Sequence, residues 1–251
     1  MIKTIKYLSI ALIAFGGLIF LFNPGITPDN FQFQELLNSV SQNDVIIIFN
    51  SGGWGDTPLG EAKDFAPIME GIQKTLNEWG YTSIVIPFAR TKDGFLGRLS
   101  GTKEFFNFFR TSSDDLAKKV ENIAEDLPDK KIILTGLSNG ASFVDKTYEK
   151  ISQETKNTVY AITVGPPFWA KTYESGNILR LDNSGGDSLV EGKALSLLLT
   201  FIKAPFRWIF SKINGQNLKF SQVLNISGHN YDWGSSEVGQ EITSFLAGKF
   251  R

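Results

Sequence analysis

"KKIILTGLSNGASF", residues 130–143, joins an apolar run to a glycine-serine-glycine turn and then to small and apolar residues. The run over 130–136 is typical of a buried strand, and 140–151 has the pattern of a helix. The turn between them, "GLSNG", leaves no room for side chains at its two glycines and forces Ser138 into a strained conformation. The stretch therefore predicts a tight turn in which Ser138 is either incidental or presented as a nucleophile.

The alternation of apolar runs and helical segments continues on both sides of this turn. Strands without polar alternation, separated by helices, indicate a mainly parallel sheet that is covered on both faces. Right-handed crossovers then give a three-layer α/β/α domain with a doubly wound sheet of about six strands over residues 44–251. We expect strands at 45–50, 82–88, 130–136, 157–165, 176–182 and 219–227, and helices at 64–79, 114–127, 140–151, 193–213 and 235–249.

Composition excludes several classes of function. The 251 residues carry a formal net charge of −1, so a nucleic-acid partner has no electrostatic support. Cysteine is absent, which excludes disulfides, cysteine nucleophiles and thiolate metal sites. The only histidine is His229, so a zinc site built on several imidazoles is impossible and any histidine chemistry must use this residue. We expect neither a metal nor a cofactor.

The N-terminal region has a different composition. Lys3 and Lys6 precede an uncharged run that is apolar on every face and ends at residue 22. We predict an uncleaved membrane anchor over residues 1–22, because no small-residue cleavage pattern follows; a cleaved signal peptide is the alternative. The lysines favour a domain outside the cytoplasm. Residues 23–43 are polar and proline-containing, which predicts a tether.

Three polar residues follow predicted strands in a suggestive order. In open α/β sheets, ligands gather beyond the carboxyl ends of the strands. Ser138 lies at such an end, and His229 lies in "LNISGHNYDW", between the last predicted strand and the last helix. Between them, "NILRLDNSGGDSLVEG" offers two acids, Asp187 and Asp182, of which Asp182 is nearer the strand and suited to capping the turn.

The "GLSNG" turn after a buried strand resembles the nucleophile elbow of the α/β-hydrolase superfamily, whose triad runs serine, acid, histidine along the chain. The resemblance covers roughly residues 44–250, at the level of pattern and motifs. It implies that Ser138 is the nucleophile and His229 the general base. The spacing in "SGGDSLV" is similar to that of many hydrolases and favours Asp187 as the acid, with Asp182 the alternative.

The same resemblance implies an oxyanion hole. One donor would be the backbone N–H of Asn139, the residue after the nucleophile. The second would come from "NSGGW", residues 50–54, which is similar to the His-Gly-Gly-Gly-Trp pattern of some hydrolases, with Asn50 and Ser51 replacing its first two residues. Gly52 and Gly53 are the candidate donors. A phosphate-binding loop is disfavoured, because no Gly-Lys-Ser/Thr ending follows.

The function implied is that of a membrane-anchored serine hydrolase, esterase-like or lipase-like, acting on carboxylic esters that could be lipophilic. An acyltransferase and a non-catalytic binding module are the alternatives. The apolar segments 95–110 and 193–213, and "GPPFW" at 165–169, either pack locally or form an acyl-binding rim or lid. Lys203 and Arg207 interrupt 193–213, which disfavours a membrane-spanning interpretation of that segment.

Overall fold

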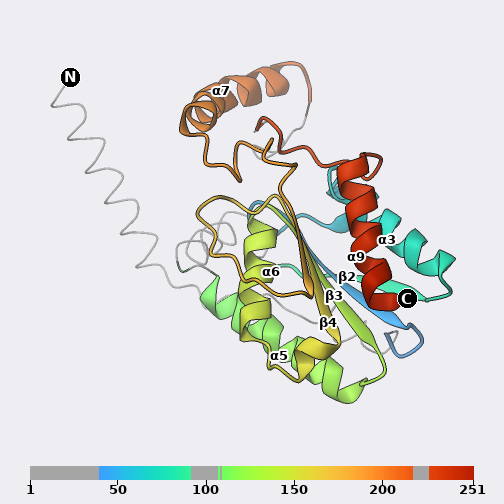
Figure 1. The fold of residues 1–251 in the computed structure, drawn as a ribbon. Coiled ribbons are helices and arrows are strands. Elements are labelled where there is room, and N and C mark those ends of the chain that lie inside the picture. The colour runs from blue at the N-terminus through green and yellow to red at the C-terminus, as the bar shows by residue number, and fades with distance from the viewer. Residues whose placement is uncertain (1–39, 92–106, 108, 217–225) are drawn as a thin grey trace.

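Five parallel strands form the central sheet of the computed structural model (Figure 1). The structure describes residues 40–91, 107, 109–216 and 226–251. In spatial order the strands are β2 (Ser83–Pro87), β1 (Val45–Asn50), β3 (Lys131–Leu137), β4 (Val159–Val164) and β5 (Ile178–Leu181). The prediction of a parallel sheet is confirmed, with five strands in the described residues instead of about six. Most of the sixth predicted strand, 219–225 of 219–227, lies outside the described residues, and Ile226 and Ser227 are in a loop.

Helices cover both faces of the sheet, as the continuous apolar strands predict. Residues of β1 alternate between the two faces: Val45, Ile47 and Phe49 pack in one core cluster, and Ile46 and Ile48 in the other. The first cluster lies under α3 (Ala66–Glu78) and α9 (Glu241–Phe250), and the second under α5 (Arg110–Asp126) and α6 (Asn139–Lys150) (Figure 1). The three-layer arrangement is therefore confirmed.

Most boundaries lie within about two residues of the predictions, but α5 begins earlier, at Arg110 instead of 114. The acids at 114 and 115 suggested a helix start there, because acids favour the first turn. In the structure the first turn is closed by Ser113, whose hydroxyl donates to the Phe109 carbonyl oxygen at 2.6 Å. Phe109 itself has a φ of 55°, so the chain enters the helix from a left-handed residue.

The remaining elements lie in the connections. They are η1 (Leu59–Glu61), η2 (Thr155–Asn157), α7 (Ala194–Ile213) and η3 (Ser236–Gln240), a π-helical turn that continues into α9. In the described part of the chain, no helix has both the length and the apolar content to cross a membrane. The predicted anchor, 1–22, lies outside the described residues.

The folded domain begins earlier than the predicted boundary at residue 44. Val40 is fully buried and belongs to the core cluster under α5 and α6. The burial of Val40 could not be predicted from the sequence, because Val40 is a single apolar residue among polar neighbours. Residues 40–43 therefore belong to the domain and not to the tether, whose other residues lie outside the described ones.

Candidate active site

Ser138 lies on a strained turn between β3 and α6. Its backbone has φ 55° and ψ −120°, a conformation that costs a residue with a side chain about 1–3 kcal/mol. Three backbone hydrogen bonds hold it there. The Ser138 N–H donates to the Val164 carbonyl at 2.8 Å, and the Ser138 carbonyl accepts from the Ala141 N–H at 2.9 Å and from the Ser142 N–H at 3.2 Å. A strained residue held so firmly at a strand end is a candidate for function.

The glycines on either side of Ser138 are required by space. A Cβ on Gly136 would lie 2.7 Å from the Ala141 nitrogen, in the first turn of α6. A Cβ on Gly140 would lie 2.7 Å from the Ser51 carbonyl oxygen and closer still to that of Asn50. The predicted reason for both glycines is thus confirmed. It also shows that α6 packs directly on the chain that leaves β1.

His229 and Asp187 are joined by a short hydrogen bond. His229 Nδ1 lies 2.6 Å from Asp187 Oδ2, and Asp187 is fully buried. Asp182, the alternative acid, is exposed. Two further bonds tie the loops together: Ser188 N–H donates to the Ser227 carbonyl at 2.9 Å, and Asn183 Nδ2 to the Gly228 carbonyl at 2.8 Å. The structure therefore pairs His229 with Asp187.

Asp187 is stabilised as an anion. Burial alone raises the pKa of Asp187, but hydrogen bonds from His229, Tyr231 and the Leu189 N–H outweigh it and hold the pKa below its ordinary value. Because an ionised Asp187 can only accept, the proton of the neutral imidazole lies on Nδ1, which leaves His229 Nε2 as an acceptor.

Tyr231 is a site residue that the sequence analysis missed. Its hydroxyl donates to Asp187 Oδ2 at 2.7 Å, on the same oxygen that binds His229. Burial and the neighbouring Asp187 raise the pKa of Tyr231, so the hydroxyl stays a donor. A tyrosine two residues after the only histidine was visible in "GHNYDW", but no sequence pattern indicates that it faces Asp187.

His229 lies near the strand end that carries Ser138. A Cβ on Gly165 would come within 2.7 Å of His229 Cε1, and Gly165 directly follows Val164, the residue that binds the Ser138 N–H. Both site residues thus flank the Val164–Gly165 corner at the end of β4. Among the described residues, no hydrogen bond joins the Ser138 hydroxyl to His229 directly. Such bonds are often long in a free active site and tighten when substrate binds.

The predicted oxyanion donors lie around Ser138. A Cβ on Gly52 would lie 3.6 Å from Ser138 Cβ and 3.2 Å from the Leu137 carbonyl oxygen. Asn139 Nδ2 donates to the Gly53 carbonyl at 3.3 Å, which ties the loop after β1 to α6. Asn139 is the first residue of α6, so its N–H has no carbonyl one turn earlier in the helix and lies at the positive end of the helix dipole.

These features decide the type of fold. A serine on a strained turn between a central parallel strand and a helix has the geometry of a nucleophile elbow, and the paired Asp187 and His229 follow it in that order along the chain. The chain has an α/β-hydrolase fold. The catalytic roles of Ser138, Asp187 and His229 are predictions.

Comparisons with known proteins give structural neighbours only. No family model matches the sequence, and no curated protein matches it. Similar solved structures include a Trichoderma reesei cutinase in complex with a phosphonate inhibitor, which is 16% identical, with 70% of this chain and 85% of that chain covered and a TM-score of 0.47. An acetylxylan esterase is 13% identical, with 81% of this chain and 97% of that chain covered and a TM-score of 0.43. A protein from Xanthomonas campestris pv. campestris, described as a putative hydrolase of the α/β superfamily, is 12% identical, with 82% of this chain and 99% of that chain covered and a TM-score of 0.40.

In this hydrolase fold, Arg90 holds the loop that carries Gly52 and Gly53. Its Nη2 donates to the Ser51 carbonyl at 2.6 Å, and its guanidinium lies over the rings of Phe109 and Phe143 at 5.0 and 5.3 Å. Burial lowers the pKa of Arg90 to about 10, which leaves it charged at neutral pH. Arg90 could not be predicted as a site residue, because a single arginine after β2 has no distinguishing pattern in the sequence.

Exposed aromatic side chains lie on loops beyond the carboxyl ends of the strands. Trp54 follows the glycine loop, and Phe168 and Trp169, whose rings are 4.9 Å apart, follow β4. The Phe168 N–H donates to the Leu189 carbonyl at 3.0 Å, which connects "GPPFW" to the segment that carries Asp187. The structure therefore places 165–169 beside the candidate site. Of 95–110, residues 95–106 and 108 lie outside the described residues.

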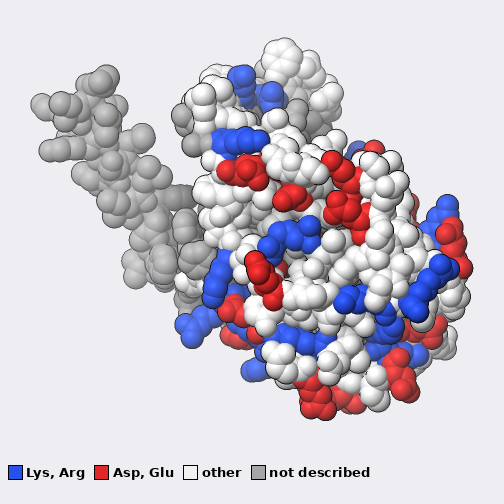
Figure 2. Space-filling view, in the orientation of Figure 1, with Lys and Arg blue, Asp and Glu red and all other residues white. Residues whose placement is uncertain are grey.

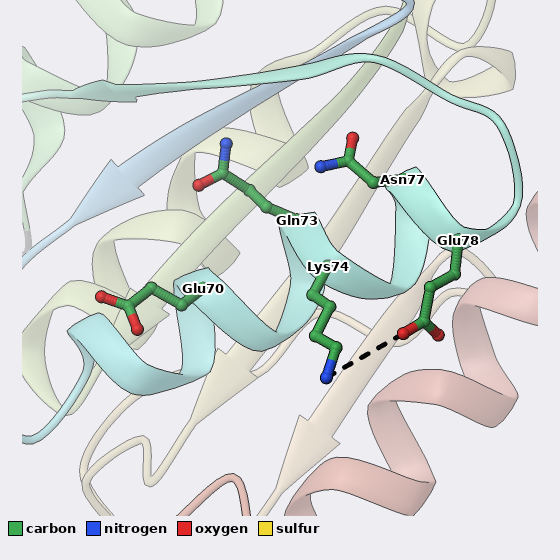
Figure 3. Close-up of a pocket in the computed structure, with 5 residues that line it drawn as sticks. All are labelled: Glu70, Gln73, Lys74, Asn77 and Glu78. Atoms are coloured by element: carbon green, nitrogen blue, oxygen red, sulfur yellow. Dashed lines mark ion pairs between the residues drawn. The ribbon is translucent and has the colours of Figure 1, made fainter.

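A separate hollow lies on the outer face of α3 and shows no features of a site. Figure 3 shows the side chains that line it, which all project from that one helix: Glu70, Gln73, Lys74, Asn77 and Glu78. Lys74 and Glu78 form an exposed ion pair at 4.0 Å, and exposed ion pairs of this kind contribute little to stability. In the described ranges, no group of three or more histidine or acidic side chains is arranged to hold a metal ion.

Proposed function

We propose that this chain is a serine hydrolase that cleaves carboxylic esters through an acyl-enzyme. The observation that carries the proposal is the buried carboxyl group of Asp187, which binds His229 Nδ1 beside the strand end that presents Ser138. A merely structural histidine needs no buried carboxylate that fixes its tautomer. That arrangement leaves Nε2 unprotonated, which is the state a general base requires.

In the proposed reaction, His229 Nε2 removes the hydroxyl proton of Ser138 as its Oγ attacks the ester carbonyl. The oxyanion is bound by the N–H of Asn139 and by that of Gly52 or Gly53. The C–O bond then breaks, and the leaving alcohol takes the proton from His229. Water then attacks the acyl-enzyme while His229 Nε2 removes its proton. The bond between the acyl carbon and Ser138 Oγ breaks, and His229 returns the proton to Oγ, which releases the carboxylic acid and the free Ser138 hydroxyl.

Asp187 and Tyr231 have supporting roles in this proposal. Asp187 orients the imidazole and stabilises its charged form while the proton resides on Nε2. Tyr231 donates to the same carboxylate oxygen and keeps the buried anion satisfied as the charge on His229 changes.

Labelling with a fluorophosphonate probe tests the nucleophile. Wild type should be labelled and Ser138→Ala should not. Ser142→Ala is the matched control, because Ser142 lies one turn along α6 from Ser138 and should leave labelling unchanged. An unlabelled wild type, or a Ser138→Ala variant that labels as strongly as wild type, would show that the nucleophile assignment is wrong and would favour a non-catalytic binding module.

The substrate class and the location are further parts of the proposal. Exposed Trp54, Phe168 and Trp169 beside the site favour esters with an apolar acyl group, which a series of nitrophenyl esters of increasing chain length would test. Adding an acceptor alcohol to the same assay separates acyl transfer from hydrolysis. We further propose that residues 1–22 anchor the enzyme with its domain outside the cytoplasm; alkaline carbonate extraction and protease accessibility in spheroplasts test this, since a domain protected from protease contradicts it.

A further inference from the structure

Helix α7 exposes most of the large apolar side chains that the structure describes in it. Six of the large residues recur every three or four positions along the whole helix, and each is between 46% and 75% exposed: Leu195, Leu199, Ile202, Phe206, Ile209 and Ile213. The buried side of the helix carries one large apolar residue, Leu197, and three small or polar ones: Thr200, Ala204 and Ser211. A helix of a soluble protein normally turns its apolar stripe toward the core. This inversion indicates that the stripe binds something outside the domain.

The charges beside the stripe indicate what that partner is. Within Ala194–Ile213 the ionisable residues are Lys203, Arg207 and Lys212, and the helix contains no acidic residue. In Figure 2 the part of the surface formed by α7, at the top of the view, is white with blue atoms and shows no red atoms. Phe210, one residue after Ile209, adds exposed aromatic surface beside the stripe. Apolar, aromatic and cationic side chains on one helix are typical of helices that lie in the interface of an anionic bilayer.

A second copy of the chain fits this surface less well. Two α7 helices paired along their stripes would bring their cations, among them Lys203 and Arg207, close together with no acids on either helix to neutralise them. An anionic lipid surface supplies the complementary charge, and each cation near such a surface contributes about 1 kcal/mol.

We propose that α7 is a docking surface for lipid bilayers that contain anionic headgroups. The helix lies along the membrane with its apolar stripe among the acyl chains and its cations at the headgroups. Its first turn is attached to the site segment, because the Lys193 N–H donates to the Ser188 carbonyl at 3.0 Å, one residue from Asp187. Docking of α7 therefore brings the candidate site to the bilayer surface. The docking itself does not depend on Ser138 being catalytic.

The absence of cysteine makes a local test possible. Ile209→Cys in α7 and Lys74→Cys on the exposed face of α3 each accept one environment-sensitive nitrobenzoxadiazole label. The full chain is reconstituted in phosphatidylcholine vesicles with or without about one third phosphatidylglycerol. The α7 label should shift to the blue and be quenched by brominated acyl chains in the anionic vesicles, while the α3 label should stay aqueous. Each label reports one position only, so membrane binding elsewhere in the chain does not contribute.

Charge variants and a second probe complete the test. Lys203→Gln with Arg207→Gln should lower the ratio of docked to undocked α7 about 25-fold, which is about fivefold for each cation. Phe206→Cys, on the same stripe, should repeat the behaviour of Ile209→Cys. Adding Ser138→Ala should change nothing, so loss of hydrolysis and loss of docking are distinguishable. The proposal is overturned if the fluorescence of the α7 labels still reports an aqueous environment in anionic vesicles. It is also overturned if the labels report an apolar environment in the absence of lipid as the protein concentration rises, which would indicate binding of a second copy.

Discussion

Replacing Gly140 with alanine tests whether the close packing of α6 on the chain after β1 presents Ser138. The added Cβ would lie 2.7 Å from the Ser51 carbonyl oxygen, whereas ordinary van der Waals contact begins at 3.4 Å. The backbone cannot easily yield there, because Asn50 is fully buried and its Nδ2 donates to the Thr135 carbonyl at 3.0 Å. The Asn50 carbonyl oxygen would be closer still, so helix α6 and the loop after β1 must separate by about 1 Å.

Two consequences of Gly140→Ala are expected. Overpacking of this kind costs about 1–3 kcal/mol of unfolding free energy, which lowers the melting temperature of a domain of this size by roughly 2–10 °C. A misplacement approaching 1 Å between nucleophile and oxyanion donors slows the reaction by up to about 100-fold. We therefore expect fluorophosphonate labelling of the folded protein to slow by 10- to about 100-fold.

Gly60→Ala is the matched control. A Cβ on Gly60 would meet no atom within 4 Å, and its φ lies outside the left-handed region, so both stability and labelling should be unchanged. Labelling is measured at a temperature well below the unfolding transition of each variant, followed by circular dichroism. If Gly140→Ala labels at the wild-type rate and melts at the wild-type temperature, the tight contact does not exist and the steric account of the elbow is wrong.

Three further predictions follow from the site and the core. Asp187→Asn should slow labelling by about 10³-fold or more, because it no longer fixes the histidine tautomer, whereas Asp182→Asn should change the rate less than twofold. Arg90→Met should lower the free energy of unfolding, measured in urea, by about 1–3 kcal/mol and should slow labelling, because the buried Ser51 carbonyl loses its donor. Unchanged labelling would contradict a positioning role for Arg90. Burial raises the pKa of Asp145 to about 6, so folding takes up a proton between about pH 4 and 6 and the protein gains stability as the pH falls through that range. Asp145→Asn should abolish that gain, which is about 3 kcal/mol, and equal pH dependence in both proteins would refute the assignment.

The strands and the elbow could be predicted because their signals are local. A run such as "VIIIFN" is apolar on both faces of the strand, and only burial on both sides of a sheet accommodates it. In "GLSNG", the contact that requires Gly136 is with Gly140 and Ala141, a few residues away in the chain, although the contact that requires Gly140 is with the distant Asn50 and Ser51. The choice of Asp187 over Asp182 depended on a spacing, and the structure pairs Asp187 with His229.

Tyr231 and Arg90 could not be predicted because their roles depend on contacts between distant segments. Tyr231 lies 44 residues from Asp187 along the chain, and Arg90 lies 39 residues from Ser51. The exposed stripe of α7 is a similar case. The sequence predicts an apolar helix over 193–213, but the direction in which its apolar side chains face is set by how the helix attaches to the domain.

The strain at Ser138 also explains why this serine follows β3 and no edge strand. A conformation that costs about 1–3 kcal/mol persists only where the surroundings over-determine it. In β3, the side chains of Ile132, Ile133 and Leu134 are fully buried, and each contributes about 1.5–3 kcal/mol of hydrophobic stabilisation. The edge strands β2 and β5 are mostly half-buried and are paired on one side only. A strained turn at the end of either edge strand could relax by local fraying, whereas the strand between β1 and β4 holds the serine in place.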